Sequence, residues 1–348
     1  MEKKKINIAV TALNAIDSPG PGVPVIRGLK EAGSFECKII GLAYESLEPG
    51  IYMKDLVDKT YHIPYPSSGA DNLMQRLEYI HSEEALDVII PNFDAEIFPF
   101  IKLQDKLKSM GIDTFLPTEK QFEERQKINL PEFGRTYGLD VPGSHSVYSF
   151  SEISSTIDKL GLPVVIKGKY YDAYIAFNQQ QAAEYFNKII SGWGGPVILQ
   201  EYVKGTEFNV IGLGDGKGNT VAAVPIRKQY ITDKGKAWGG ISISDKKMLE
   251  MTHTFVSATK WKGPFELELM KNESNQFVIL EINPRIPAWV YLAVGVGQNI
   301  PEALVNLALG EDVKPFEKYD VGKMFIRYSW DMIVDVKEYQ HLSTYGEL

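Results

Sequence analysis

The sequence predicts a mixed α/β protein: an N-terminal parallel-sheet domain, then a part of α+β character. In the first 118 residues three strand-like runs, INIAVTAL, CKIIGLAY and DVIIP, alternate with helical stretches near 23–33, 70–85 and 96–110. This alternation is typical of parallel strands joined by right-handed helical crossovers. After residue 119, neighbouring strand-like runs are joined by turn sequences such as DGKGN (215–219), which is typical of antiparallel hairpins.

The bulk properties restrict the function. A chain of 348 residues can hold two or three domains with an ample core. The formal net charge of −8 argues against non-specific nucleic-acid binding and means that an anionic ligand needs local cations. Cys37, in an apolar run, is the single cysteine, so we expect a small buried hydrophobe in a reducing, cytoplasmic setting.

Neither a leader nor a membrane span is expected. The basic start and the apolar stretch after it resemble a signal peptide, but Asn7, Thr11 and Asn14 interrupt the stretch, which favours a first strand. No segment is long and apolar enough to cross a bilayer, so no membrane partner is expected.

Two loops follow predicted strands of the N-terminal sheet. The first, NAIDSPGPG (14–22), lacks the GxGxxG spacing, and its prolines remove amide donors, so NAD binding is rejected. The second carries Asn92, Asp94 and Glu96. Such acids at the carboxyl end of a strand can bind a small ligand. Capping of the following helix is the slightly favoured alternative.

Several cations stand at the ends of predicted elements. Lys127 belongs to a charged helical stretch, and Lys167 ends the apolar strand PVVIK, where a lysine can point into a cleft or simply snorkel to water. Further along, Arg227 and Lys228 form a basic pair on a strand.

The stretch FVILEINPR (277–285) alternates with period two. Its expected apolar face consists of Val278, Leu280 and Ile282, and its polar face of Glu281, Asn283 and Arg285. The upstream run FELEL (265–269) alternates in the same way, and the polar run KNESNQ between them predicts a hairpin turn.

With the turn centred between Ser274 and Asn275, Glu268 faces Glu281 and Glu266 faces Asn283. Like charges directly opposite destabilise a strand pair, which indicates a bound cation. The hard oxygens of Glu268, Glu281 and Asn283 suit magnesium, and the Arg285 fork suits a phosphate or a carboxylate. The alternative is a half-solvated antiparallel sheet with one polar face.

The order Lys127, Lys167, QEYVKGTE, GPFELE and EINPR resembles the ATP-grasp superfamily, especially its carbamoyl-phosphate-synthase-like and amino-acid-ligase branches. The resemblance covers residues 119–310 and implies a two-lobed ATP-grasp fold after the N-terminal domain. The implied domains are an N-terminal α/β domain (1–118), a small or lid lobe with a leading helical segment (119–203), and a large lobe with metal-binding strands (204–348).

The resemblance also implies a role for each matching position. The implied ATP-binding residues are Lys127 and Lys167 at the phosphates, Glu201 and Val203 at adenine through their backbone, and Glu207 at the ribose. The implied ligands of magnesium, or of manganese in its place, are Glu268, Glu281 and Asn283. The implied catalytic cations are Lys167, Arg285, Arg227 and Lys228.

The activity that the resemblance implies is an ATP-dependent ligase that activates a carboxylate as an acyl phosphate for attack by an amine or a thiol. Its partners would be small-molecule substrates, and a homodimer is the default assembly. Carbamoyl-phosphate-synthase-like phosphorylation of bicarbonate or carbamate, and nucleotide binding without turnover, are the alternatives.

Two departures from the family pattern bear on the activity. The lid loop (168–176) carries Tyr170, Tyr171 and Asp172 where the family usually has glycines. After EINPR the chain continues IPAW, which argues against carbamate chemistry and suggests Trp238 and Trp289 as apolar walls of the acceptor pocket.

Overall fold

A computed structural model describes residues 3–15, 19–169, 172–232, 237–329 and 331–348. The chain divides into two compact units. The first unit comprises Met1–Glu119, Asn209–Glu266 and Asn283–Leu348, and the second comprises Lys120–Phe208 and Leu267–Ile282. The finer division into three domains, 1–118, 119–203 and 204–348, stays a prediction.

The first unit begins with a parallel sheet of strand order β3-β2-β1-β4. Its strands are β1 (Lys4–Val10), β2 (Phe35–Ala43), β3 (Lys59–His62) and β4 (Val88–Ile90). The helices of this region are α1 (Gly22–Lys30), α2 (Ala70–Glu84) and α3 (Asp94–Ser109), with short 3-10 turns η1 (Pro49–Tyr52) and η2 (Pro66–Ser68). The parallel βαβ expectation is confirmed. β3, at four residues too short to show a pattern, was not anticipated.

A six-stranded sheet has the order β13-β12-β9-β10-β11-β14. Its strands are β9 (Gly205–Asp215), β10 (Thr220–Ile231), β11 (Ala237–Ser242), β12 (Lys262–Asn272), β13 (Phe277–Asn283) and β14 (Met324–Ile326). The helices of this part are α8 (Lys246–Thr259), α9 (Tyr291–Gly295) and α10 (Ile300–Ala308). The boundary between the units falls within β9, β12 and β13.

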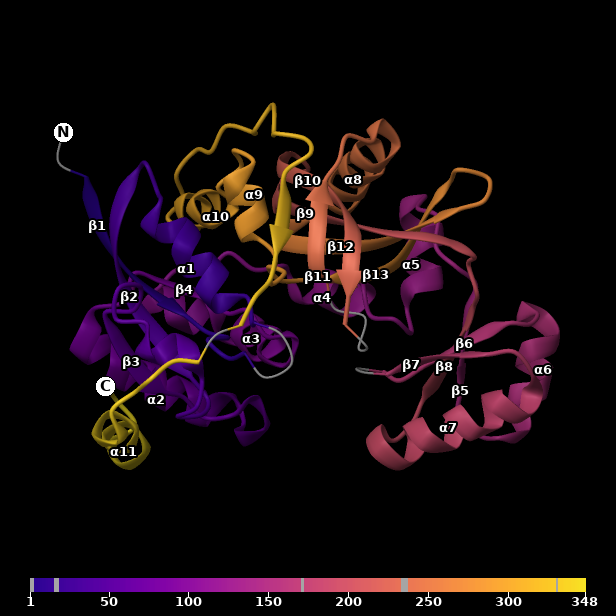
Figure 1. Cartoon of the computed structure of the whole chain (residues 1–348), viewed down its shortest axis with the longest axis horizontal. Coiled ribbons are helices and arrows are strands. Elements are labelled where there is room, and N and C mark those ends of the chain that lie inside the picture. Colours follow the sequence, from indigo (N-terminus) through magenta and orange to yellow (C-terminus); the bar gives the residue numbers. More distant parts are fainter. Residues whose placement is uncertain (1–2, 16–18, 170–171, 233–236, 330) are drawn as a thin grey trace. The chain divides into compact units, whose positions relative to one another are not determined.

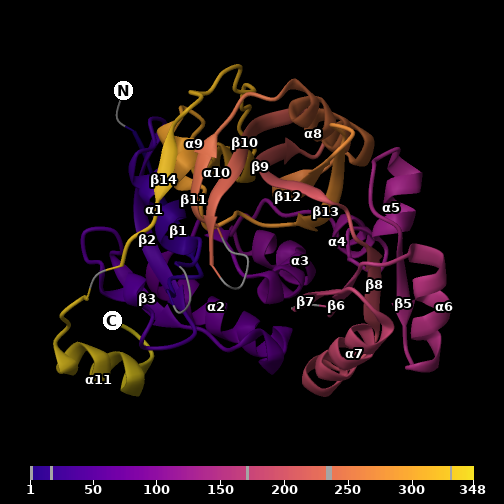
Figure 2. The ribbon, with the colours of Figure 1, turned by 45° about the vertical axis from the view of Figure 1, so that its right-hand side comes forward.

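The second unit contains an antiparallel sheet of order β5-β8-β6-β7. Its strands are β5 (Ser144–Val147), β6 (Val164–Lys167), β7 (Ala173–Ala176) and β8 (Val197–Glu201), and its helices are α5 (Leu130–Tyr137), α6 (Ser151–Leu160) and α7 (Gln179–Trp193), with α4 (Glu119–Glu124) at its start. Both α6 and α7 cover one face of the sheet (Figures 1 and 2). Ile166 of β6 packs in that apolar core, so Lys167 extends from the opposite face.

The C-terminal region has less strand than its sequence predicts. The run GKMFIRYSWDMIVD (322–335) predicts closing strands, but the described part of this run contains the three-residue strand β14, and helix α11 (Val336–Tyr345) follows. β14 pairs with β11, whereas Ile333 and Val336, further along the chain, are exposed. The chain end instead bonds to β3 of the first unit, where Thr60 and Leu348 exchange two backbone hydrogen bonds of 2.9 Å.

The mixed α/β class is confirmed. Among the residues that the structure describes, no helix has the length and apolar character needed to cross a membrane.

Candidate active site

An ion pair in the second unit joins two residues that the sequence assigned to different ligands. Lys127 lies in the turn between α4 and α5, and its Nζ is 3.3 Å from Oε1 of Glu281 on β13. Both side chains are largely buried, with 16% and 24% of their surfaces exposed. A pair this shielded from water interacts more strongly than a surface ion pair.

Lys167 is the centre of the same charged group. Burial lowers the pKa of its ammonium, and the neighbouring Lys127 lowers it further, while the carboxylates of Glu281, Glu268 and Glu207 oppose the shift. All five residues lie in the second unit. The group therefore combines two ammonium groups with three carboxylates, two of which, Glu268 and Glu281, lie on the strands of the predicted hairpin.

The two residues predicted to meet adenine occupy the end of this unit's sheet. The Glu201 amide donates to the Gly143 carbonyl over 2.8 Å, and the Gly143 amide donates to Glu201 Oε2 over 3.2 Å. The Glu201 amide is therefore already used inside the unit. Val203 lies between β8 and β9. Their adenine-binding roles stay predictions.

A second group of interacting residues, in the first unit, surrounds the buried carboxylate of Glu266. Glu266 is 5% exposed. Its Oε1 accepts hydrogen bonds from Asn209 Nδ2 (2.8 Å) and Trp289 Nε1 (2.7 Å). Its Oε2 accepts from Asn283 Nδ2 (3.3 Å) and Arg285 Nη1 (3.2 Å). A buried carboxylate is tolerated only when donors satisfy it, and here both oxygens are satisfied.

The contact between Asn283 and Glu266 is the one that the hairpin register predicts. Asn283, like Glu266, is 5% exposed, so the alternative of a half-solvated polar face is wrong at these two positions. The expected faces of β13 also need correction. Phe277 and Ile279, on the side of the polar residues, are fully buried, whereas Val278 and Leu280 are half-buried. Both faces of β13 are therefore covered.

The two acids after β4, Asp94 and Glu96, differ in whether they cap helix α3. Glu96 is completely buried, accepts from the Asn92 and Phe93 amides (2.6 and 2.9 Å) and from the hydroxyls of Thr11 and Tyr44, and so caps α3. Asp94 instead accepts from Arg285 Nε over 3.2 Å. Capping is thus confirmed for Glu96, while Asp94 contacts a predicted site residue.

Sequence reasoning missed three members of this group. Glu266 appeared only as the partner of Asn283, Asp94 as a loop acid, and Arg327 not at all. Burial lowers the pKa of Arg327 to about 10, while the nearby Glu266 carboxylate opposes the shift. Arg327 also donates from Nη1 to the Pro19 carbonyl over 3.0 Å. The sequence gives no sign that Glu266 is buried, because polar residues in an alternating strand are expected on the face that meets water.

The interactions described above do not connect Arg227, Lys228 or the lid residues to the group around Lys167 or to the group around Glu266. Arg227 is exposed and Lys228 is half-buried, and as consecutive residues of β10 they point to opposite faces. Of the lid residues, Asp172 accepts from Trp193 Nε1 over 2.8 Å, and Tyr170 and Tyr171 lie outside the described residues.

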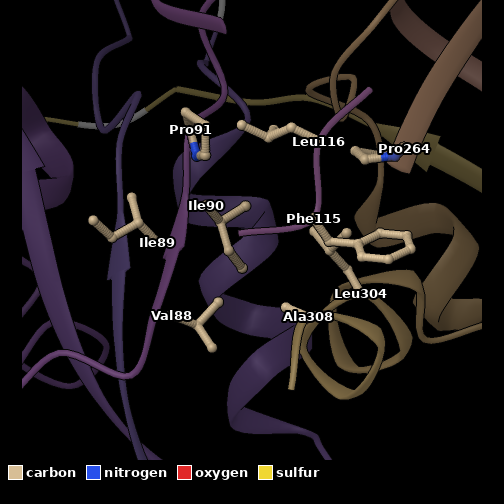
Figure 3. A pocket seen from close by; sticks show the side chains of 9 residues that line it. All are labelled: Val88, Ile89, Ile90, Pro91, Phe115, Leu116, Pro264, Leu304 and Ala308. Carbon is tan, nitrogen blue, oxygen red and sulfur yellow. The ribbon is translucent and has the colours of Figure 1, made fainter. Parts of the chain in front are cut away.

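Trp289 does not act as a simple apolar wall, since it is 5% exposed and its indole N–H bonds to Glu266. Trp238 is half-buried on β11. A small apolar hollow lies elsewhere in the first unit, between β4, the 115–116 segment and α10 (Figure 3). Its nine lining residues include no charged side chain, so it offers nothing to a phosphate.

The donor set fits a hard divalent cation. Asn283 directs its amide nitrogen to Glu266, and Glu281 lies two residues away on the same face of β13. No group of three His, Cys, Asp or Glu side chains able to hold a metal occurs in the described part of the chain. Magnesium commonly takes only one or two protein carboxylates and fills its shell with phosphate oxygens and water.

A family described as ATP-grasp in the biosynthetic pathway with Ter operon matches residues 195–326. That range contains the hinge motif, both strands of the hairpin, and Arg285. Residues 195–326 therefore belong to the ATP-grasp superfamily.

Other ATP-grasp relatives are distant in sequence. The carbamoyl phosphate synthase large chain of Clostridium acetobutylicum is 23% identical over 83% of this chain and 27% of its own length. The tyramine–L-glutamate ligase of Methanocaldococcus fervens is 25% identical over 61% of this chain and 72% of its own. The chain thus spans about a quarter of the carbamoyl phosphate synthase chains that it matches.

Solved structures share the fold. The biotin carboxylase of Campylobacter jejuni has a TM-score of 0.72 at 16% identity and covers 91% of this chain and 74% of its own. The L-amino acid ligase of Bacillus licheniformis has a TM-score of 0.66 at 16% identity and covers 90% of this chain and 78% of its own.

Proposed function

We propose that this ATP-grasp protein is a ligase that uses ATP to activate a carboxylate as an acyl phosphate, which an amine then attacks. The charged group around Lys167 carries the proposal. The two ammonium groups can contact phosphate oxygens, and the three carboxylates beside them can bind divalent cations that supply the further positive charge that phosphoryl transfer requires. The ligase names of several relatives support the reaction class.

In the proposed reaction a carboxylate oxygen of the acid attacks the γ-phosphorus of ATP, and the bond from that phosphorus to the β-γ bridging oxygen breaks. This gives ADP and an acyl phosphate. The amine nitrogen then attacks the acyl carbon, phosphate leaves, and the amine gives up a proton. Lys127 and Lys167 would hold the phosphates, and Arg285 would hold the acid or the phosphoryl group.

Glu268, Glu281 and Asn283 would hold magnesium, or manganese in its place, which when bound would neutralise charge on the phosphates. The adenosine would lie against the backbone at Glu201 and Val203, with Glu207 on the ribose hydroxyls. Arg227 and Lys228 remain secondary candidates for contacts with the acyl phosphate.

A second candidate is phosphorylation of bicarbonate or carbamate. It is favoured by the match to carbamoyl phosphate synthase over 83% of this chain. The acceptor, a one-carbon acid rather than a larger one, is the only difference in the first step, so one assay separates the two.

Hydroxylamine trapping tests the proposal. The full chain, ATP and magnesium are incubated with a panel of amino acids, peptides, small organic acids and bicarbonate, in the presence of hydroxylamine. A stable hydroxamate formed together with ADP for an organic acid supports the ligase. ADP release with bicarbonate alone supports the second candidate. Failure of every acid to release ADP overturns both and favours a protein that binds nucleotide without turnover.

A further inference from the structure

Arg285 has two carboxylate partners whose exposure differs sixfold. Its Nη1 lies 3.2 Å from Glu266 Oε2, and its Nε lies 3.2 Å from Asp94 Oδ2. The Glu266 side chain is 7% exposed and the Asp94 side chain is 43% exposed. All three residues belong to the first unit. The distances are equal, so burial and the other contacts of each acid decide which partner can leave.

Glu266 cannot leave without breaking other bonds. Three more side chains, Asn209, Trp289 and Asn283, donate to its two oxygens. Moving this carboxylate would strand several buried donors, each at a substantial desolvation cost. Asp94 is the first residue of α3 and has water on one side. Water can solvate its carboxylate when the pair with Arg285 opens, so this pair is the weaker one.

We propose that Asp94 is an exchangeable counter-ion of Arg285, which the oxyanion of the substrate displaces, while Glu266 stays bound as the fixed partner. The inference rests on the proposed function for the identity of that oxyanion, a carboxylate or a phosphoryl group. Arg285 and Arg327 balance Glu266 and Asp94 in charge, so replacing Asp94 by a substrate carboxylate conserves the charge at Arg285, and a phosphoryl group adds negative charge there. Asp94 thereby competes with the substrate anion for Arg285 and lowers the affinity of Arg285 for that anion.

The test measures anion binding at Arg285 without turnover. Phenylglyoxal modifies accessible arginines, and peptide mass mapping gives the labelling rate of Arg285 at increasing inorganic phosphate or, in a second series, acetate. In Asp94→Asn the anion concentration that halves labelling should fall about fivefold, the fold-change equivalent to about 1 kcal/mol. A fall with acetate indicates a carboxylate as the displacing group, and a fall with phosphate alone indicates a phosphoryl group.

Asp58→Asn is the matched control. Asp58 pairs with Lys30 over 3.1 Å and is also 43% exposed, but it lies on another part of the first unit. It should leave the protection of Arg285 unchanged. An equal fall in both variants, or no fall in Asp94→Asn, overturns the proposal.

The thermal stability of two variants distinguishes the fixed partner, Glu266, from the exchangeable partner, Asp94. Asp94→Asn should shift the thermal unfolding midpoint by less than about 2 °C, whereas Glu266→Gln should lower it more, because it places an amide donor among buried donors. Equal shifts would overturn the distinction. The labelling experiment needs no acid substrate and no ATP, so a protein that fails the hydroxamate assay can still pass it, and the two failures remain distinguishable.

Discussion

Lys127 Nζ lies 3.3 Å from Glu281 Oε1 inside the second unit. The sequence assigned the lysine to ATP phosphates and the glutamate to magnesium. Their contact shows that the two proposed binding functions share one electrostatic group, so a change at either residue alters the surroundings of the other and of Lys167.

Glu281→Gln should reduce turnover at least about 100-fold, because it removes a metal-binding charge and the partner of Lys127. The protein should stay folded, with a loss of about 1 to 3 kcal/mol in the free energy of unfolding, because the pair with Lys127 is largely buried while Glu268 and Glu207 remain in the same charged group. Steady-state ADP release and urea unfolding measure the two quantities. Glu338→Gln, which removes a similarly exposed partner of Lys54, is the control. Loss of folding in Glu281→Gln would indicate a structural role instead.

Lys167→Ala should lower the rate by about 10²- to 10³-fold if the ammonium stabilises charge in the transition state. Single-turnover kinetics at saturating ATP isolates this step from binding. Lys159→Ala, on helix α6 of the same unit, should leave the rate unchanged. Near wild-type kinetics in Lys167→Ala would remove this residue from the mechanism.

The pH dependence tests the environment of Lys167. Its pKa lies below the usual 10.5, so the cation is lost, and kcat/KM for ATP falls, on an alkaline limb below that value. Lys127 lowers this pKa, so Lys127→Met should move the limb to higher pH. Between the lowered pKa and 10.5 the unfolded chain binds more protons, so stability should rise with pH there. A limb unmoved in Lys127→Met would contradict the coupling.

Glu48 should give the protein a second, opposite pH dependence. Burial raises the pKa of this carboxyl to about 7 from 4.5. The folded state then binds more protons between these values, so the free energy of unfolding should fall by up to about 3 kcal/mol as pH rises from 4.5 through 7. Urea unfolding at pH 5 and pH 8 measures it. Glu48→Gln should flatten this difference, whereas the exposed Glu132→Gln should retain it.

Trp289→Phe should lower the free energy of unfolding by about 1 to 3 kcal/mol, because it removes a donor from the buried Glu266 carboxylate. Trp193→Phe is the matched control. Its Nε1 donates to Asp172 over 2.8 Å, but the side chain is 49% exposed, so the change should stay within about 0.5 kcal/mol. Equal losses in the two variants would show that burial of the acceptor is not the cause.

Local patterns were sufficient for much of this molecule. The alternation of strands and helices predicted the parallel sheet, because a buried parallel strand and an amphipathic helix have different periods. The turn sequence after FELEL led to the prediction that Glu266 meets Asn283, and the structure contains this contact. The ordered motifs also led from the sequence to the superfamily.

The sequence by itself thus determined the fold class, the contact between Glu266 and Asn283, and the set of charged residues on the hairpin strands. Only the tertiary structure decided that Glu266 is buried, that Arg327 lies near it, and that Asp94 pairs with Arg285 although 191 residues separate them. The period of a strand records which face a residue occupies. It does not record which distant segment covers that face, and the covering segment determines burial, and with it the strength of a charge.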